Sequence, residues 1–117
     1  MRIANFTLHL QDELLQEWRA AGFEMVPGPR APLVLAEAET WTAERVKAVV
    51  EEAIDRIAEE RFEAVLIGGL TDAMVYATLR AWQQGLRVFV AVSPRVRDAR
   101  TGRFRFEFRG VREVIQP

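Results

Sequence analysis

Two short runs of uninterrupted apolar residues constrain the fold of this chain more than any other feature of its sequence. Residues 64–67 are Ala-Val-Leu-Ile, and residues 88–92 are Val-Phe-Val-Ala-Val. Such runs are typical of strands that are covered on both faces, as in parallel sheets. Residues 72–84 lie between them and repeat apolar residues at helical spacing. The segment therefore predicts two parallel strands joined by a right-handed crossover helix.

The residues before this unit predict two more strands and one more helix. Residues 3–6 and 23–26 are short segments in which three of four residues are apolar, which favours strands. Residues 12–21 lie between them and repeat apolar side chains at helical spacing up to Gly22, which is placed to end a helix. Residues 27–32 hold three prolines and predict a loop, because proline lacks a backbone N–H.

Two longer segments predict helices that cover the sheet. Thr42 is a good N-cap for a helix that we expect to run to about Arg61, with apolar side chains on one side and charges on the other. Residues 72–84 predict the crossover helix, which Gly85 ends. We expect four of its side chains to face inward: Met74, Val75, Leu79 and Trp82.

The C-terminal segment changes to the alternating pattern of a half-buried strand. In residues 103–109 three Phe residues alternate with charged ones, and residues 98–102 before them are typical of a turn. We therefore predict a β-hairpin over residues 95–109 at the edge of the sheet, with the Phe row in the core. Residues 111–115 favour one more short strand.

Together these elements predict one α/β domain over residues 1–117, Rossmann-like, with a mostly parallel sheet, about three helices and a C-terminal β-hairpin at the sheet edge. A chain of 117 residues suits one hydrophobic core. It has no Cys, which favours a reducing compartment, and we expect it to be cytoplasmic. No apolar run approaches the roughly 20 residues of a membrane span, so we expect no membrane partner.

Charge is divided unevenly along the chain. Residues 1–93 hold nine Arg and Lys against fourteen Asp and Glu, whereas residues 94–117 hold seven Arg against three acidic residues. The two parts therefore have formal charges of −5 and +4. A basic end of this kind is either a solvated surface or a place for a phosphate-bearing ligand, and the sequence leaves both open.

Polar residues or glycines follow three of the predicted strands, and ligands of open α/β sheets bind at the carboxyl ends of strands. Two adjacent glycines allow close backbone approach, and the helix after them offers free N–H groups to an anion. The turn equally fits an ordinary strand-to-helix connection, since neither G-x-G-x-x-G nor G-x-x-x-x-G-K-[ST] is present. The candidate ligand-binding residues are Asn5, Thr7, Gly68, Gly69, Thr71 and Asp72, with Ser93 and Arg95 at the third strand end.

His9 is the only histidine, and it follows the first predicted strand. Imidazole is the side chain best suited to proton transfer near neutral pH, although a single surface His commonly has no such task. Without Cys, a second His or an acidic triad, we expect no metal site and no cofactor. Because alternation in residues 103–109 puts Phe and Arg on opposite faces, we expect no long nucleic acid as a partner.

Four segments resemble the small accessory Csx-type proteins of type III CRISPR loci. They are Asn5-Phe6-Thr7, Ile67-Gly68-Gly69-Leu70-Thr71, residues 89–96 and residues 104–113. In several of those proteins a strand ending in Ser or Thr precedes an Arg-Val step, a short turn and an aromatic-basic strand that closes in an Arg-Glu pair. Here Ser93, Arg95-Val96 and Arg112-Glu113 follow that order. The resemblance covers the C-terminal half best and the first residues loosely.

That family is Rossmann-like and dimeric, and its members bind cyclic oligoadenylate messengers of antiviral defence or cleave them as ring nucleases. For this chain the resemblance implies a homodimer that holds cyclic tetra-adenylate at its two-fold axis, with residues 68–71 near the phosphates. It implies metal-independent cleavage by a ribose 2′-hydroxyl, with Ser93 and Arg95 near the scissile ribose and His9 as the only candidate base. Two alternatives stay open: a protein that binds the messenger without cleaving it, and an interaction module whose basic hairpin docks on a partner protein or RNA.

Overall fold

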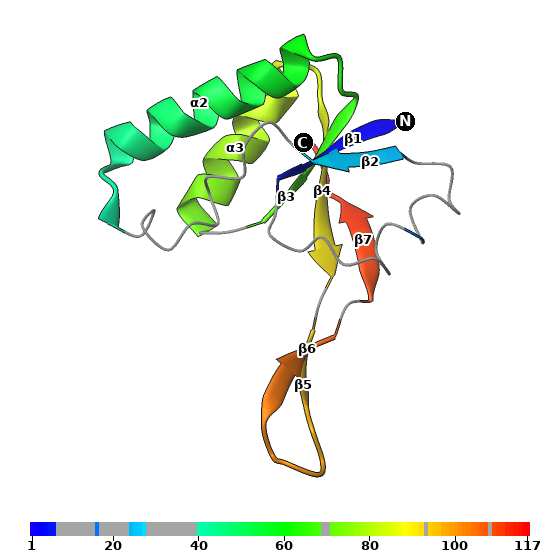
Figure 1. Ribbon diagram of the computed structural model, residues 1–117. Coiled ribbons are helices and arrows are strands. Elements are labelled where there is room, and N and C mark those ends of the chain that lie inside the picture. Colours follow the sequence, from blue (N-terminus) through cyan, green and yellow to red (C-terminus); the bar gives the residue numbers. More distant parts are fainter. Residues whose placement is uncertain (7–15, 17–23, 28–39, 69–70, 93, 108) are drawn as a thin grey trace.

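A five-stranded sheet forms the centre of the protein in a computed structural model, which describes residues 1–6, 16, 24–27, 40–68, 71–92, 94–107 and 109–117 (Figure 1). The strands have the order β2-β1-β3-β4-β7. Strands β1 to β4 are parallel, and β7 runs antiparallel to β4. This confirms the α/β class and the mostly parallel sheet. The bounds are β1 Arg2–Phe6, β2 Glu24–Pro27, β3 Ala64–Ile67, β4 Arg87–Val92 and β7 Gly110–Glu113.

Strand β3 is central because all of its side chains are apolar and both of its faces are covered. All four residues are buried. Val65 and Ile67 belong to the cluster that packs against the helices, whereas Ala64 and Leu66 belong to a smaller cluster with Ile3. Alternate residues of a strand project to opposite faces. The sheet therefore buries apolar side chains on both sides, as the uninterrupted run predicts.

Two helices, α2 (Ala43–Glu59) and α3 (Thr71–Gln83), cover one face of the sheet side by side (Figure 1). The hydroxyl of Thr42 accepts the N–H of Arg45 at 3.2 Å, which confirms the predicted cap. Helix α2 ends two residues before the predicted Arg61, which has a φ of 62°. Of the helix expected over residues 12–21, Gln16 is helical and the other residues lie outside the described part of the chain. A third helix therefore stays a prediction.

Helix α3 buries a row of alanines at a spacing of four residues: Ala73, Ala77 and Ala81. Val75 and Leu79, which we expected to face inward, are 57% and 49% exposed, so that expectation is wrong. Met74 and Trp82 are partly buried against the core. Small side chains let a helix lie close to its neighbours, which explains why the inward face is narrower than the apolar pattern suggests.

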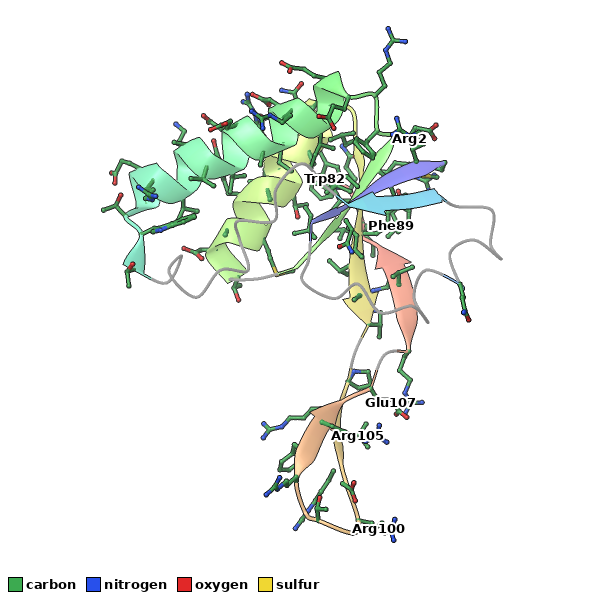
Figure 2. The ribbon with its side chains drawn as sticks, viewed as in Figure 1. Arg2, Trp82, Phe89, Arg100, Arg105 and Glu107 are labelled. Carbon is green, nitrogen blue, oxygen red and sulfur yellow. The ribbon has the colours of Figure 1, made fainter. Side chains whose placement is uncertain are left out.

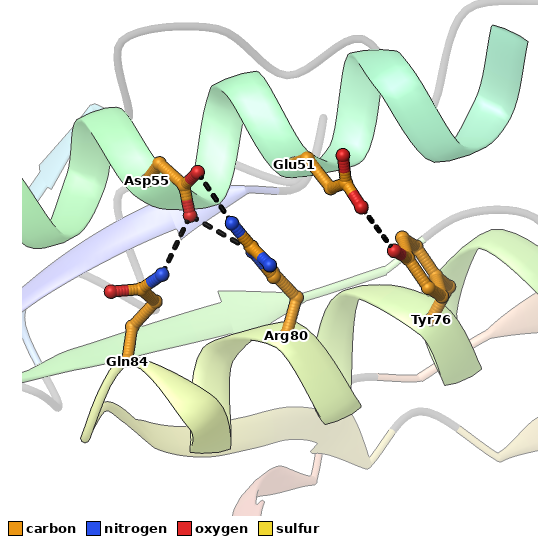
Figure 3. Close-up of polar contacts among 5 residues, drawn as sticks. All are labelled: Glu51, Asp55, Tyr76, Arg80 and Gln84. Atoms are coloured by element: carbon orange, nitrogen blue, oxygen red, sulfur yellow. Dashed lines mark hydrogen bonds and ion pairs between the residues drawn. The ribbon is translucent and has the colours of Figure 1, made fainter.

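A polar seam joins α2 to α3 along their exposed side (Figure 3). Arg80 donates two hydrogen bonds to the carboxylate of Asp55, at 2.9 and 2.7 Å, and the side-chain amide of Gln84 donates a third at 2.9 Å. The hydroxyl of Tyr76 donates to a carboxylate oxygen of Glu51 at 2.5 Å. That hydrogen bond raises the pKa of Tyr76 above its ordinary value of 10.0.

The C-terminal part projects from the sheet as a separate two-stranded ribbon, which we name the cationic arm (residues 94–109; Figures 1 and 2). Strands β5 (Arg95–Arg97) and β6 (Phe104–Phe106) pair antiparallel, and Gly102 N–H donates to the Asp98 carbonyl at 2.8 Å in the turn. The predicted hairpin and turn are confirmed, but the hairpin forms its own two-stranded sheet, and β7 is the edge strand of the main sheet. Phe104, however, is 55% exposed, so the expected burial of the Phe row is wrong at this position.

The arm continues the β4–β7 ladder with an offset of one residue. The last pair of the sheet is Val92 with Gly110, and the first pair of the arm ladder is Arg95 with Phe106. Two residues, 93–94, separate these pairs on one strand, and three, 107–109, on the other. One extra residue on one strand is the signature of a β-bulge, which bends and twists the ribbon. The pairing register therefore shifts by one residue between the sheet and the arm.

An ion pair ties β7 to β4 at the edge of the sheet, beside the start of β4. The guanidinium of Arg87 donates two hydrogen bonds to the carboxylate of Glu113, at 2.8 and 2.6 Å, and lies 5.3 Å from the centre of the Phe89 ring. These hydrogen bonds hold the pKa of Glu113 below its ordinary value of 4.5.

Candidate functional site

The carboxyl ends of three parallel strands meet at one edge of the sheet. Phe6 at the end of β1 is in register with Ile67 at the end of β3, and Ile67 is in register with Val90 in β4. Strand β2 lies on one side of β1, whereas β3 and β4 lie on the other side. The direction in which strands are added to the sheet therefore reverses between β1 and β3. In open parallel sheets such a reversal leaves room for a ligand at the carboxyl edge.

Four of the predicted ligand-binding residues lie at this edge, and we name them the strand-end site: Asn5, Gly68, Thr71 and Asp72. Asn5 is 3% exposed and is the penultimate residue of β1. It is in register with Leu66, which is in register with Phe89. A buried amide thus lies in line with apolar residues of the next two strands, on the face of the sheet that lies opposite α2 and α3.

The start of α3 forms the other side of the strand-end site. Gly68 follows β3 directly and is partly buried. Thr71 is the first residue of α3, which begins one residue before the predicted start at residue 72. The carboxylate of Asp72 accepts the N–H of Ala73 at 2.9 Å. The helix start thus carries exposed N–H donors of partial positive charge together with one carboxylate that engages one of them.

Arg95 lies apart from the strand-end site. It is the first residue of β5, and its guanidinium carbon lies 4.0 Å from the centre of the Phe104 ring on the opposite strand of the arm. The remaining predicted site residues, Thr7, His9, Gly69 and Ser93, lie outside the described residues. The structure therefore brings Asn5, Gly68, Thr71 and Asp72 to one edge and assigns Arg95 to the arm.

The strand-end site offers groups suited to an anionic, hydrogen-bonding ligand. Backbone N–H groups at the start of α3 favour phosphate or carboxylate oxygens. The amide of Asn5 and the hydroxyl of Thr71 add neutral donors and acceptors. Among the described residues, no group of three or more His, Cys, Asp or Glu side chains is arranged to hold a metal ion. No helix in the described segments is both long and apolar enough to cross a membrane.

The sequence-based interpretation missed the Arg95–Phe104 contact. The signal was present in the turn at residues 98–102, because a hairpin closed there pairs Arg97 with Phe104 and brings Arg95 next to that pair. The alternating pattern of residues 103–109 describes the two faces of one strand, whereas the cations beside Phe104 are Arg95 and Arg97 of the other strand.

No protein-family model matches this chain, and no curated protein matches it either.

Proposed function

We propose that this protein binds a cyclic oligoadenylate, with cyclic tetra-adenylate as the first candidate, at the strand-end site. The observation that carries the proposal is the meeting of the carboxyl ends of β1, β3 and β4 beside the start of α3, at the point where strand order reverses. The resemblance of this turn and of the C-terminal half to the Csx-type proteins supplies the ligand class.

The groups of the site match the parts of such a ligand. The N–H donors at the start of α3 suit a phosphate, since they carry partial positive charge and point out of the helix end. Asn5 suits the edge of an adenine, because an amide donates and accepts at the same time. Gly68 has no side chain to keep a ribose or phosphate away from the backbone. The protein thereby recognises charge and base within one edge.

A homodimer is part of the proposal, because cyclic tetra-adenylate has a two-fold axis and a C₂ dimer presents each group to both halves of the ring. The exposed side chains of Val75 and Leu79, one turn apart on α3, supply an apolar contact on the helix whose start lies at the site. We expect Val75→Ser/Leu79→Ser to convert the dimer to monomers in light scattering. A dimer that persists in this variant places the interface elsewhere.

The proposal includes ring opening without a metal. The ribose 2′-oxygen forms a bond to the adjacent phosphorus as the bond from that phosphorus to the 5′-oxygen breaks. The 2′-hydroxyl proton goes to a base, for which His9 is the candidate, and the departing 5′-oxygen takes up a proton. The products are a 2′,3′-cyclic phosphate and a 5′-hydroxyl. In-line alignment and stabilisation of charge on phosphate oxygens supply the acceleration, with Ser93 as the proposed contributor.

Binding is tested by calorimetry with cyclic tetra-adenylate, with an expected ratio of one ring to two chains. Thr71→Glu adds a carboxylate in the first turn of α3, where it suits the helix but opposes a phosphate, and we expect it to weaken binding about tenfold. Gln83→Glu adds the same charge at the far end of α3 and serves as the matched control. Absence of heat with the wild-type protein contradicts the proposal.

Ring opening is tested by chromatography of the same mixture with EDTA over many hours. A linear product with a 2′,3′-cyclic phosphate end supports cleavage, and His9→Ala then slows its formation. An intact ring with full binding contradicts cleavage and leaves a protein that sequesters the messenger.

A further inference from the structure

The cationic arm concentrates positive charge on one projection of an otherwise acidic protein. It holds six arginines against Asp98 and Glu107, a net charge of +4, and the rest of the chain carries −5 because the whole chain carries −1. Figure 2 shows Arg100 and Arg105 on the arm, away from the sheet. A polyanion is therefore attracted to the arm and repelled by the remainder of the protein.

Both acidic residues of the arm are engaged in its construction. The carboxylate of Asp98 accepts the N–H groups of Arg100 at 2.7 Å and Thr101 at 3.3 Å, which shapes the turn. Glu107, at the base of the arm, forms an ion pair with Arg109 at 2.6 Å and lies 3.9 Å from Arg105. The carboxylates therefore order the backbone and the base of the arm, while Arg97 and Arg103 are exposed.

Pairing of the two strands gives the arm two different faces. Residues directly opposite each other in an antiparallel ladder project to the same face. Arg97 lies opposite Phe104, so the face of Arg97 and Arg95 also carries an exposed aromatic ring. Val96 lies opposite Arg105 on the other face. One face of the arm thus combines cations with an aromatic side chain.

The contact between Arg95 and Phe104 organises that face. The guanidinium lies over the ring at 4.0 Å, within the range of a cation–π contact, and Phe104 keeps more than half of its surface exposed. Planar guanidinium groups and aromatic rings both present flat surfaces on which a nucleobase stacks. The pair is already assembled in the free protein, so less side-chain freedom is lost when a base stacks on it.

We propose that the cationic arm binds single-stranded nucleic acid, with Phe104 and Arg95 stacking a base and Arg97 and Arg103 holding phosphates. Cations beside an exposed aromatic ring on an extended ribbon are the combination that sequence-tolerant single-strand binding uses. The expectation that no long nucleic acid is a partner rested on burial of the Phe row, and Phe104 is exposed. This activity is separate from the proposed binding of a cyclic oligoadenylate.

Single strands fit the arm better than duplexes or anionic membranes do. Bases in a duplex are stacked on one another and present no free flat face to Phe104, so a duplex meets the charge of the arm alone. A membrane surface is bound through a wide apolar face beside the cations. Among the described residues of the arm, Phe104 is the large apolar side chain that is exposed. One aromatic ring is enough to stack a base, but it does not form the wide apolar face that membrane binding needs.

The test measures fluorescence anisotropy of labelled 12-mers of uridine and of deoxythymidine across a series of salt concentrations, with the full-length protein. We expect Phe104→Ala to weaken binding of the single strand roughly 5- to 100-fold. Phe104→Leu keeps an apolar side chain without a π-face and should lose nearly as much, whereas Phe104→Tyr should bind like the wild type. Arg97→Gln/Arg103→Gln should reduce the slope of log affinity against log salt by about 1.4, the value for two lost phosphate contacts.

Matched controls separate the arm from bulk charge. Lys47→Gln/Arg61→Gln removes the same charge from α2 and the residues after it, and we expect little change in affinity. Thr71→Glu should also leave oligonucleotide binding intact, so failure of this proposal is distinguishable from failure of the strand-end site. Circular dichroism establishes that each variant is folded.

Four outcomes would overturn the proposal. They are no binding of either 12-mer at low salt, full affinity in Phe104→Ala, equal affinity for a duplex of the same length, and capture of anionic lipid vesicles in preference to both 12-mers. Preference for the ribo- or the deoxyribo-oligomer identifies the source of the strand and supports the proposal in either case.

Discussion

Two nitrogens of Arg80 on α3 donate hydrogen bonds to Asp55 on α2, one to each carboxylate oxygen, at 2.9 and 2.7 Å. The two residues are 25 positions apart in sequence, and they lie on neighbouring helices that β3 separates along the chain. Planar guanidinium and carboxylate groups match in this geometry, which a Lys in place of Arg80 would lose. The contact fixes the position of α3 along α2, and with it the position of the helix start that borders the strand-end site.

A double-mutant cycle should therefore show coupling between these residues. Asp55→Ala and Arg80→Ala should each lower the midpoint of thermal unfolding, and the double variant should lower it by less than the sum of the two. Asp55→Asn should lower the midpoint by less than Asp55→Ala, because the Asn side chain keeps an oxygen that can accept the hydrogen bond from Gln84. Additive shifts would mean that the pair contributes nothing as a pair.

Enlarging the alanine row of α3 should destabilise the protein. Ala77 is fully buried, and Ala77→Leu forces three extra carbons into the space between α3 and the core, which should cost about 1–3 kcal/mol of unfolding free energy. Leu79→Ala on the exposed side should change the unfolding free energy of the monomer by less than about 0.5 kcal/mol. Urea unfolding at low protein concentration measures both. An Ala77→Leu protein as stable as the wild type would contradict close packing of this face.

The pair of Arg87 and Glu113 should make stability depend on pH below neutrality. The pKa of Glu113 is lower in the folded protein than its ordinary value of 4.5, so folding favours the ionised carboxylate. Its stabilising effect is complete at a pH well above 4.5 and is lost as the pH falls through the lowered folded value. The melting temperature of Glu113→Gln should therefore lie below that of the wild type at pH 7 and approach it at strongly acidic pH.

Arg87→Met provides the control for this pH dependence. Without the guanidinium, Glu113→Gln should have little further effect at any pH. A difference between the wild type and Glu113→Gln that stays constant from neutral to strongly acidic pH would show that the carboxylate does not titrate as described.

Removal of the cationic arm should leave the sheet folded. Val92 and Gly110 lie opposite each other at the end of the β4–β7 ladder, so a two-residue Asn-Gly turn can join them in place of residues 93–109. The helices and both hydrophobic clusters are made by residues outside this range. We expect native far-ultraviolet circular dichroism and a cooperative melt. Loss of the melt would mean that the arm is required for folding.

The sequence predicts the centre of the fold well because β3 is buried along its whole length and Val88 and Phe89 of β4 are buried beside it. Strands β3 and β4 are the two uninterrupted apolar runs, and the Thr42 cap starts α2 as its side-chain chemistry dictates. The chain order of strands and helices also predicts which strand ends meet, since parallel strands expose their carboxyl ends at one edge. The sequence alone therefore groups Asn5, Gly68 and Thr71 at one edge of the sheet.

The sequence does not predict the exposure of Val75, Leu79 and Phe104, because that exposure depends on which elements pack against each other. An apolar residue on α3 has no fixed environment until its neighbours are placed, and no helix packs over Val75 and Leu79 among the described residues. Phe104 alternates like a core residue, but its partner strand projects from the sheet with it. The chemistry of the arm arises from Arg95 and Phe104 across the ribbon, and alternation along one strand carries no information about that pairing.

Three residues, 107–109, connect the arm ladder to β7, whereas two residues connect it to β4. The pairing inside the arm is set by its own turn and does not change with the length of these connections. Deleting the codon for residue 108 would bring the two ladders into one register and keep every arginine, and we expect it to change the direction of the arm relative to the sheet. The number of residues between the two ladders therefore helps to set the direction in which this protein extends its charge, and a single deletion can change that number.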